Sequence, residues 1–337
     1  MARRRELARA DRVLPGLWRL RLPLPWPGVP HGNAYAIAAG DGVVLVDTGL
    51  HEPGSMRQLE LALDQAGLRI EHVRLLVCTH AHSDHYGQAG PLTMRSGAEL
   101  WMHPNHAHMT RAAEDPERAF ERRFEIARQS GVPAEALDAY REARGGTSFG
   151  IAEIVMPDRE LLPGLEVETD LGTWQVHETP GHAPSHVVLH QPERGLLLSG
   201  DHLLGRVSLY YDFGYTPDPA GEFLSSLDVV DRLPVQLVLS GHGRPVRGAR
   251  ELTEANRRAV RERMWRIRDA LADGPRTAFD VVPEMLDVEL PGPMMIGWGL
   301  TEALCYLNHM ELRDEVEKLE GEDTDRWRLR AGAPKLG

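Results

Sequence analysis

The densest group of potential metal ligands in the chain directly follows an apolar run, Val73–Cys78, that is typical of a buried strand. Four candidate ligands fall within six positions there: His80, His82, Asp84 and His85. Alternate side chains of an extended chain point the same way, so His80 and His82 can bind one ion. Asp84 and His85 follow where the chain turns towards a helix, and they can reach another ion. The spacing therefore predicts two metal ions rather than one.

Three more candidate ligands each follow a short hydrophobic strand that runs out into a turn containing glycine. They are His182, Asp201 and His242. Imidazole and carboxylate ligands suit Zn²⁺, Mn²⁺ or Fe²⁺, and no cysteine lies among them. Two cations that share a water lower its pKa from about 15.7 towards 7, so that hydroxide forms at neutral pH. We therefore expect two divalent metal ions, with Zn²⁺ first and Fe²⁺ or Mn²⁺ as alternatives, and hydroxide as the nucleophile.

Together with Asp47-Thr48-Gly49 upstream, these motifs resemble those of the metallo-β-lactamase-fold hydrolase superfamily. The resemblance implies an α/β fold, a four-layer αββα sandwich, with a dinuclear site like that of glyoxalase II. It implies a first metal held by His80, His82 and His182, a second held by Asp84, His85 and His242, and Asp201 as the bridge between them together with a water or hydroxide. The superfamily uses the aspartate at the position of Asp47 to orient a ligand histidine. The alternative for Asp47 is a turn aspartate that caps the following segment.

The predicted reaction is hydrolysis of a small carbonyl substrate, either a thioester or an ester or lactone. Asp84 is a candidate proton shuttle, because it lies close enough to the expected bridging water to take its proton. Many zinc β-lactamases of the superfamily carry a cysteine ligand where this chain has Asp201, and lack a histidine ligand at the position of His85, so β-lactam hydrolysis is not expected. The alternative function is that of a ribonuclease or phosphodiesterase of the same superfamily.

Composition limits the partners and the compartment. The net charge of −12 disfavours polyanions, so nucleic acid is an unexpected partner, although a local basic patch would permit it. No apolar run approaches the ~20 residues of a membrane span, and Arg3-Arg4-Arg5 is not followed by the apolar stretch of a signal peptide. Two cysteines, Cys78 and Cys305, give no disulfide framework. We expect a cytoplasmic enzyme with a small-molecule substrate and no membrane partner.

The length of 337 residues predicts one large domain and a smaller one. The composition shifts to helices from about residue 250, so we expect the catalytic domain over residues 1–250 and a smaller helical domain over 251–337. Residues 104–150 are expected to form a helical insertion, with a kink near Asp115-Pro116. Its Phe120 and Phe124 are candidates for a substrate-pocket wall, with packing of the insertion onto the domain as the alternative. Three histidines at its start resemble a further metal cluster but are expected to have a structural or solvent role: His103, His106 and His108.

The segment after Asp201 contains Tyr210 and Tyr211, whose hydroxyl groups could donate to a developing oxyanion; ring packing is the alternative. His186 and His202 are expected to hydrogen-bond near the site without binding metal. Helices over 251–272, 279–286 and 299–312, followed by a hairpin over 314–330, resemble the winged-helix-like C-terminal domain of some members. A helical segment that packs on the catalytic domain or on a partner in a homodimer would have the same pattern.

Overall fold

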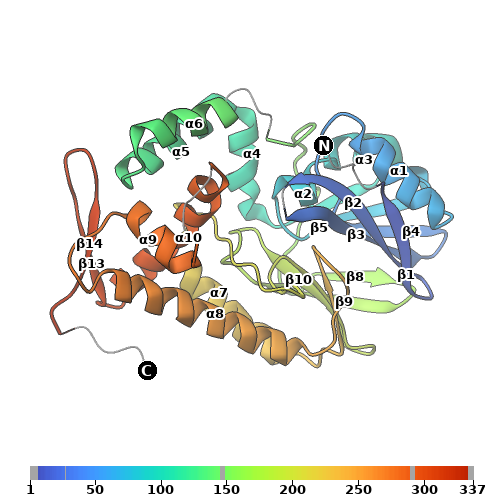
Figure 1. Cartoon of the computed structure of the whole chain (residues 1–337). Coiled ribbons are helices and arrows are strands. Elements are labelled where there is room, and N and C mark those ends of the chain that lie inside the picture. Colours follow the sequence, from blue (N-terminus) through green and yellow to red (C-terminus); the bar gives the residue numbers. More distant parts are fainter. Residues whose placement is uncertain (1–6, 27, 145–148, 289–292, 333–337) are drawn as a thin grey trace.

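Two β-sheets lie face to face between layers of helices (Figure 1). The computed structural model describes residues 7–26, 28–144, 149–288 and 293–332. In this part of the chain the first sheet has seven strands in sequence order, antiparallel up to β4 and parallel from β4 onwards. Its strands are β1 (Arg9–Leu14), β2 (Leu17–Trp26), β3 (Val29–Ala39), β4 (Gly42–Val46), β5 (Val73–Cys78), β6 (Glu99–Met102) and β7 (Arg159–Glu160).

The second sheet has the strand order β12-β11-β10-β9-β8, in which β11 and β12 are parallel and the other pairs antiparallel. Its strands are β8 (Glu166–Thr169), β9 (Gly172–Glu178), β10 (Val187–Gln191), β11 (Leu196–Gly200) and β12 (Leu237–Ser240). Val77, Trp174 and Leu189 are among the buried side chains that fill the space between the two sheets. Both sheets are thus buried on their facing sides, as in a sandwich.

Helices cover the outer face of each sheet. On the first sheet, α1 (Ser55–Gln65) and α3 (Ala89–Ser96) bury Leu59 and Leu92 against strand residues such as Leu76. On the second, α7 (Pro219–Asp231) and α8 (Ala249–Ala270) share a core with strand residues such as Val238. The predicted four-layer αββα arrangement is confirmed.

The helical insertion is present where the sequence predicts it, as α4 (Ala107–Glu114), α5 (Pro116–Gln129) and α6 (Ala134–Arg144). The kink lies at Asp115, whose side chain caps α5 by accepting a hydrogen bond from the backbone N–H of Arg118. The sequence predicts that the last of these helices ends at Gly145-Gly146, which lies outside the described residues. The three helices lie beside the C-terminal helices in Figure 1.

The C-terminal segment continues with α9 (Ala278–Leu286), α10 (Pro293–Leu312) and the hairpin of β13 (Val316–Leu319) and β14 (Arg326–Leu329). An antiparallel bridge joins Arg276, between α8 and α9, to Trp327 of β14. This order of elements is the one expected of a winged-helix-like segment. The helix α10 shares one apolar core with the insertion and with α7, through side chains such as Tyr140 and Leu304. The division of the chain at residue 250 stays a prediction.

One expected strand is divided. Residues 12–24 alternate between apolar and polar for part of their length, which predicts one outer strand. The chain instead turns at Pro15 and Gly16, where Gly16 has φ 82°, and forms the end of β1 and the start of β2. Proline followed by a residue in the left-handed region is a turn signal that outweighs the alternating pattern. None of the helices in the described part of the chain is long and apolar enough to span a membrane.

Candidate metal centre

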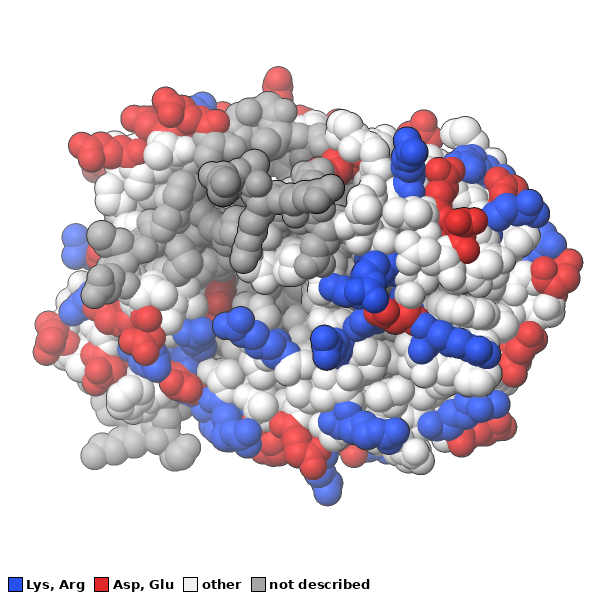
Figure 2. Space-filling model, turned by 45° about the vertical axis from the view of Figure 1, so that its right-hand side comes forward, with Lys and Arg blue, Asp and Glu red and all other residues white. Residues whose placement is uncertain are grey.

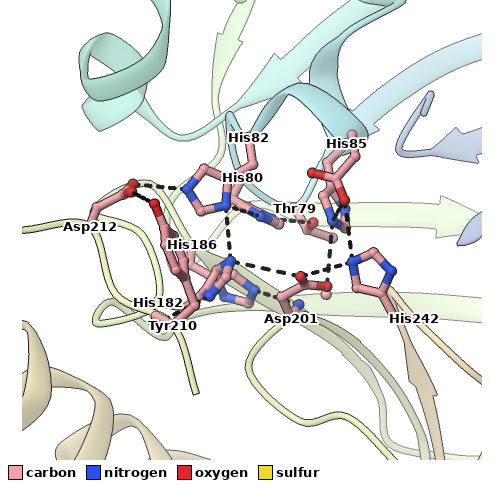
Figure 3. A network of polar contacts seen from close by, with 12 residues as sticks. Thr79, His80, His82, His85, His182, His186, Asp201, Tyr210, Asp212 and His242 are labelled. Atoms are coloured by element: carbon pink, nitrogen blue, oxygen red, sulfur yellow. Dashed lines mark hydrogen bonds and ion pairs between the residues drawn. The ribbon is translucent and has the colours of Figure 1, made fainter. Parts of the chain in front are cut away.

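The segments that follow β5, β9, β11 and β12 meet at one edge of the sandwich. The backbone N–H of Val187 donates to the carbonyl of Thr79 at 2.9 Å, which ties the loop that follows β9 to the end of β5. The N–H of Gly241 donates to the carbonyl of Gly200 at 2.7 Å, which ties the end of β12 to the end of β11. Backbone bonds of this kind fix the loops that carry the candidate ligands, so four segments distant in sequence present their side chains to one place (Figure 3).

His80, His82 and His182 form the first group of candidate ligands. Nδ1 of His82 lies 3.0 Å from Nε2 of His80 and 2.9 Å from Nε2 of His182. One ring N–H can serve only one of these contacts, so three converging imidazole nitrogens are poorly satisfied by hydrogen bonds alone. Three nitrogens at ~2.0–2.1 Å from one ion would lie about 3.4 Å apart in tetrahedral geometry, close to what is observed. The group therefore fits a single divalent cation.

Asp84, His85 and His242 form the second group. Nε2 of His242 lies 3.2 Å from Oδ2 of Asp84, and Nε2 of His85 lies 3.6 Å from the same oxygen. Nε2 of His85 is fully buried and has no hydrogen-bond partner among the described residues. A buried donor or acceptor without a partner costs free energy, and a cation bound to Nε2 of His85 would remove this cost.

Asp201 lies between the two groups. Its Oδ2 is 3.1 Å from Nε2 of His242 and 3.8 Å from Nε2 of His182, and its Oδ1 is 3.4 Å from Nε2 of His85. Oδ1 also has no hydrogen-bond partner among the described residues. A carboxylate that reaches both groups has the position required of a ligand shared by two ions.

The outer nitrogen of every candidate ligand histidine faces an oxygen. These pairs are His80 Nδ1 with Thr79 Oγ1 at 3.0 Å, His82 Nε2 with Asp212 Oδ2 at 2.9 Å, His85 Nδ1 with Asp47 Oδ2 at 2.9 Å, His182 Nδ1 with the carbonyl of Tyr210 at 3.1 Å and His242 Nδ1 with the carbonyl of His31 at 3.1 Å. A ring N–H that donates outwards leaves the lone pair of the inner nitrogen pointing into the site. The surroundings therefore prepare five imidazoles as ligands.

Asp47 orients more than His85. Its Oδ1 accepts a hydrogen bond at 2.8 Å from the backbone N–H of Thr79, the residue before His80. Asp47 itself has φ 64°, in the left-handed region that costs most residues about 1 kcal/mol or more. The structure thus holds Asp47 in an unfavourable backbone conformation. In this conformation its carboxylate contacts both His85 of the second group and the backbone N–H of Thr79, which precedes His80 of the first group.

Burial and charge act differently on the two groups. Burial lowers the pKa of His182 to about 4 and that of His80 well below its usual value, so these two imidazoles are neutral. Burial also opposes protonation of His82, but the carboxylate of Asp212 outweighs it and raises the pKa of His82. Burial also opposes protonation of His242, but the carboxylates of Asp201 and Asp84 outweigh it and raise the pKa of His242 to about 10. Excess negative charge in the second group is thus balanced by a proton unless a cation takes its place. The donor set of five imidazoles and two carboxylates fits divalent metal ions.

Glycine is required where β12 meets the centre. A Cβ on Gly241 would collide with Oδ1 of Asp201 and would lie 2.7 Å from Cε1 of His85. Asp201 is also held from behind, because its backbone N–H donates to Nε2 of His186 at 3.1 Å. His186 is buried beside the site, as the sequence analysis predicts, and its Nδ1 lies 2.8 Å from Oγ1 of Thr179. His202 is buried next to it and packs on Phe223 with ring centroids 5.0 Å apart.

Asp212 and His108 belong to the centre, and the sequence analysis did not select them. Oδ2 of Asp212 lies 2.8 Å from Nδ1 of His108 as well as 2.9 Å from Nε2 of His82. Nε2 of His108 lies 2.8 Å from Oγ of Ser185, which accepts a hydrogen bond from the backbone N–H of Ala81. His103, His106 and His108 are all buried, so of the two expected roles, structural or solvent, the solvent role is excluded. The signal that could have identified His108 is its alignment on one helix face with the buried Ala112.

The candidate pocket residues lie in different parts of the structure. Tyr210 lies at the centre, where its hydroxyl donates to Oδ1 of Asp212 at 3.2 Å. Tyr211 points the other way and is fully buried, with its hydroxyl 3.2 Å from that of Tyr306 in α10. Phe120 and Phe124 pack against the core shared by the insertion and the C-terminal helices. Phe120 and Phe124 thus have the positions of residues that pack the insertion onto the domain.

Comparison with known proteins agrees with this geometry. Residues 27–242 match the model of the metallo-beta-lactamase superfamily, so the chain belongs to this superfamily. Its two-sheet sandwich and the histidine and aspartate groups define a metal-dependent hydrolase fold with sites for divalent metal.

Three similar proteins illustrate the range of relatives. The chain is 27% identical over 314 residues to the probable metallo-hydrolase YqjP of Bacillus subtilis, a match that covers 88% of this chain and 92% of that one. A metallo-beta-lactamase family protein of Thermus thermophilus has a TM-score of 0.80 at 28% identity, covering 95% of this chain and 100% of that one. The hydroxyacylglutathione hydrolase GloC of Haemophilus influenzae is 25% identical over 178 residues, or 51% of this chain and 69% of that one. The first two matches each cover most of this chain.

Proposed function

We propose that this protein is a dinuclear metal hydrolase, with zinc as the first candidate, that acts on a small carbonyl substrate, a thioester or an ester or lactone. The observation that carries the proposal is the position of Asp201, whose two carboxylate oxygens reach His182 of the first group and His85 and His242 of the second. A carboxylate with this reach is suited to hold two cations close together. Two bound cations would supply a water with a pKa near 7 and would polarise the carbonyl under attack.

The protein's own groups supply orientation and proton transfer. Asp84 Oδ2 lies at the inner side of the second group, 3.2 Å from Nε2 of His242, where it can bind a cation or take a proton. Tyr210 keeps its proton, because burial and then the charge of Asp212 raise its pKa well above the usual value. Its hydroxyl already donates to Asp212, so its part is to hold that carboxylate against His82. The role of oxyanion donor therefore does not fall to Tyr210 in this arrangement.

Thioesters are favoured among the carbonyl substrates. A relative that covers about half of this chain is named as a hydrolase of hydroxyacylglutathione, which is a thioester. All seven candidate ligand residues of the proposal meet at one edge of the sandwich. A hydroxide held by two cations there would be the nucleophile, so no side-chain nucleophile is needed. Hydrolysis of a thioester and of an ester would use the same groups, and the leaving group distinguishes them.

The test is metal content and hydrolysis measured on the same samples of wild type and Asp201→Asn. We expect about two metal ions per wild-type chain by elemental analysis and turnover of acyl thioesters. Asp201→Asn should lose at least one ion and lower kcat/KM by roughly 100-fold or more, because the remaining amide cannot bridge two cations. Asp64→Asn, on the exposed side of α1, is the control and should behave as wild type. Full activity of Asp201→Asn would refute the two-metal proposal.

A phosphodiesterase is the second candidate, and one surface feature favours it. Figure 2 shows Lys and Arg side chains in a row across the middle of one face, with Asp and Glu among them, although the net charge of the chain is −12. Such a row could attract a phosphate-bearing substrate to an otherwise acidic protein. Turnover of bis-p-nitrophenyl phosphate or of a short RNA, with no turnover of any thioester or ester, would replace the first proposal by this one.

A further inference from the structure

Three aromatic rings from distant segments form a continuous row beside the metal centre. Trp26 ends β2, Tyr210 follows the Asp201 loop, and Trp298 lies on α10. The ring centroids of Tyr210 and Trp298 are 6.5 Å apart, and those of Trp298 and Trp26 are 6.1 Å apart, both edge to face. These are ordinary distances for aromatic pairs in contact. We propose that this aromatic wall, formed by Trp26, Trp298 and Tyr210, binds the apolar acyl group of the substrate, an inference that rests on the proposed hydrolase function.

The wall reaches the first group of metal ligands through Tyr210. The centroid of the Tyr210 ring lies 5.7 Å from that of His82 and 5.6 Å from that of His182, and Figure 3 shows the Tyr210 side chain beside these rings. An acyl group that begins at a carbonyl between the two ligand groups therefore meets this ring within a few bonds.

The strand that ends in Trp26 passes beside the second group. The hairpin of β2 and β3 brings Gly32 between Leu24 and His242: a Cβ on Gly32 would lie 3.7 Å from Cδ1 of Leu24 and 3.8 Å from Cε1 of His242. Trp26 follows Leu24 by two residues at the end of the same strand, past a register shift between Pro23 and Trp26. The strand that passes beside His242 thus also carries the ring that contacts Trp298.

The three rings keep part of their surface free. Trp26, Tyr210 and Trp298 are half-buried, whereas the neighbouring Tyr211 is fully buried. Beside Trp298 on α10, a Cβ on Gly297 would meet no described atom within 4 Å apart from its chain neighbours and the backbone of its own helix. Large aromatic rings with free surface next to a reaction centre are typical of sites that bind apolar groups.

The acyl side of the substrate is the part that suits this wall. Thiol leaving groups of the glutathione or cysteamine type carry amides a few bonds from the sulfur, and burying an amide against indole rings without hydrogen bonds costs free energy. An alkyl or aryl acyl chain has no such polar groups. The wall therefore selects for the length of the acyl chain rather than for the thiol.

The position of Trp298 depends on the C-terminal segment. The hydroxyl groups of Tyr306 on α10 and of Tyr211 are 3.2 Å apart, which fixes α10 directly behind the loop that carries Tyr210. The inference therefore gives the C-terminal helices a role in substrate binding.

The first experiment measures kcat/KM for acetyl, butyryl and hexanoyl thioesters of N-acetylcysteamine with the metal-loaded enzyme. Since each buried methylene favours binding by up to about 4-fold, we expect wild type to prefer hexanoyl over acetyl by roughly 10- to 100-fold. Trp298→Ala should reduce this ratio to within about 3-fold of unity, and Trp26→Ala should reduce it independently. Trp265→Ala, which removes an exposed tryptophan of α8, is the matched control and should keep the wild-type ratio.

A binding measurement makes the test independent of turnover. Calorimetry with acetate, butyrate and hexanoate should show affinity for wild type that rises with chain length, and a rise that Trp298→Ala removes. If no thioester or ester is hydrolysed, the proposed function is refuted. The calorimetric series still shows whether the aromatic wall binds acyl chains. Affinities independent of chain length in wild type, or an unchanged dependence in folded Trp298→Ala and Trp26→Ala, would overturn the inference. Thermal unfolding of each variant shows that it is folded.

Discussion

Oδ2 of Asp212 lies 2.9 Å from Nε2 of His82, on the side of the imidazole that faces away from the other candidate ligands. The two residues are separated by 130 positions in the chain. Burial alone would raise the pKa of Asp212, but the imidazoles of His82 and His108 outweigh it and hold the pKa well below its usual range. Asp212 is thus a carboxylate that fixes the proton of His82 on its outer nitrogen and leaves the inner one free to bind metal.

Replacing Asp212 with alanine should weaken metal binding at the first group. Loss of an outer partner of a ligand histidine typically lowers metal affinity by roughly 10- to 100-fold. Competition with a chromophoric chelator measures this affinity. Asp212→Asn should restore part of it, because an amide oxygen can still accept the ring N–H, and Asp138→Ala on the exposed side of α6 is the control. Unchanged affinity in Asp212→Ala would contradict the assigned role.

His108→Ala should destabilise the protein even without metal. Removal of this ring leaves Oγ of Ser185 and Oδ2 of Asp212 each without one buried partner, which costs about 1–3 kcal/mol per group. Urea unfolding of the metal-free protein gives the free energy of unfolding. His72 is half-buried and, among the described residues, its ring hydrogen-bonds only to Arg69 in solvent-exposed contacts, so His72→Ala serves as the control. Equal stability of His108→Ala and wild type would show that the network is not formed.

Gly241→Ala should disrupt the metal centre although it adds only one methyl group. The new Cβ would collide with Oδ1 of Asp201, so the bridging carboxylate would have to move. We expect fewer than two metal ions per chain by elemental analysis. At Gly32 the same substitution meets no atom closer than 3.7 Å, so Gly32→Ala should keep both ions. Normal metal content in Gly241→Ala would mean that Asp201 does not need its present position.

Glu302 makes stability depend on pH. Burial raises the pKa of this carboxyl to about 7, against an ordinary value of 4.5, and the opposing charge of Arg263 does not cancel the effect. The folded protein therefore keeps a proton that the unfolded chain releases, so this contribution to stability is complete below about pH 4.5 and is lost as the pH rises to about 7. The loss is at most about 3 kcal/mol.

Glu302→Gln measures this effect. The variant should be more stable than wild type at pH 8, by up to about 3 kcal/mol, and equal to it at pH 4.5, because glutamine never ionises. Urea unfolding at a series of pH values gives both curves, and their difference isolates Glu302 from the other titrating groups. A constant difference across this pH range would show that Glu302 titrates normally.

Removal of metal should lower the melting temperature without abolishing the fold. An ion at 100 times its dissociation constant stabilises the folded state by about 2.7 kcal/mol, whereas the sandwich core between the sheets does not depend on metal. Scanning calorimetry before and after dialysis against a chelator tests this. Restoration by Zn²⁺, Mn²⁺ or Fe²⁺, compared at equal free concentrations, identifies the ion that the centre prefers. A melting temperature unaffected by chelation would contradict metal binding at this centre.

The sequence by itself determined the candidate ligands and the type of fold. The ligands are recognisable because each follows a short apolar strand and because four of them share one segment, which are local features. The helices of the insertion and of the C-terminal segment were predictable for the same reason, since caps and apolar periodicity act over a few residues. The prediction of one strand over residues 12–24 is wrong, because it gives the alternating pattern more weight than the turn signal at Pro15 and Gly16. The chain divides there into β1 and β2.

Only the tertiary structure decided what surrounds the ligands. Tyr210 and Tyr211 are adjacent in the irregular segment between β11 and α7, yet one lies beside His82 and the other beside Tyr306. Asp212 reaches His82 across 130 positions of the chain, and Trp298 reaches Tyr210 from a separate helix. Contacts of this range depend on how the sheets, the insertion and α10 pack together, and no local pattern in the sequence encodes them.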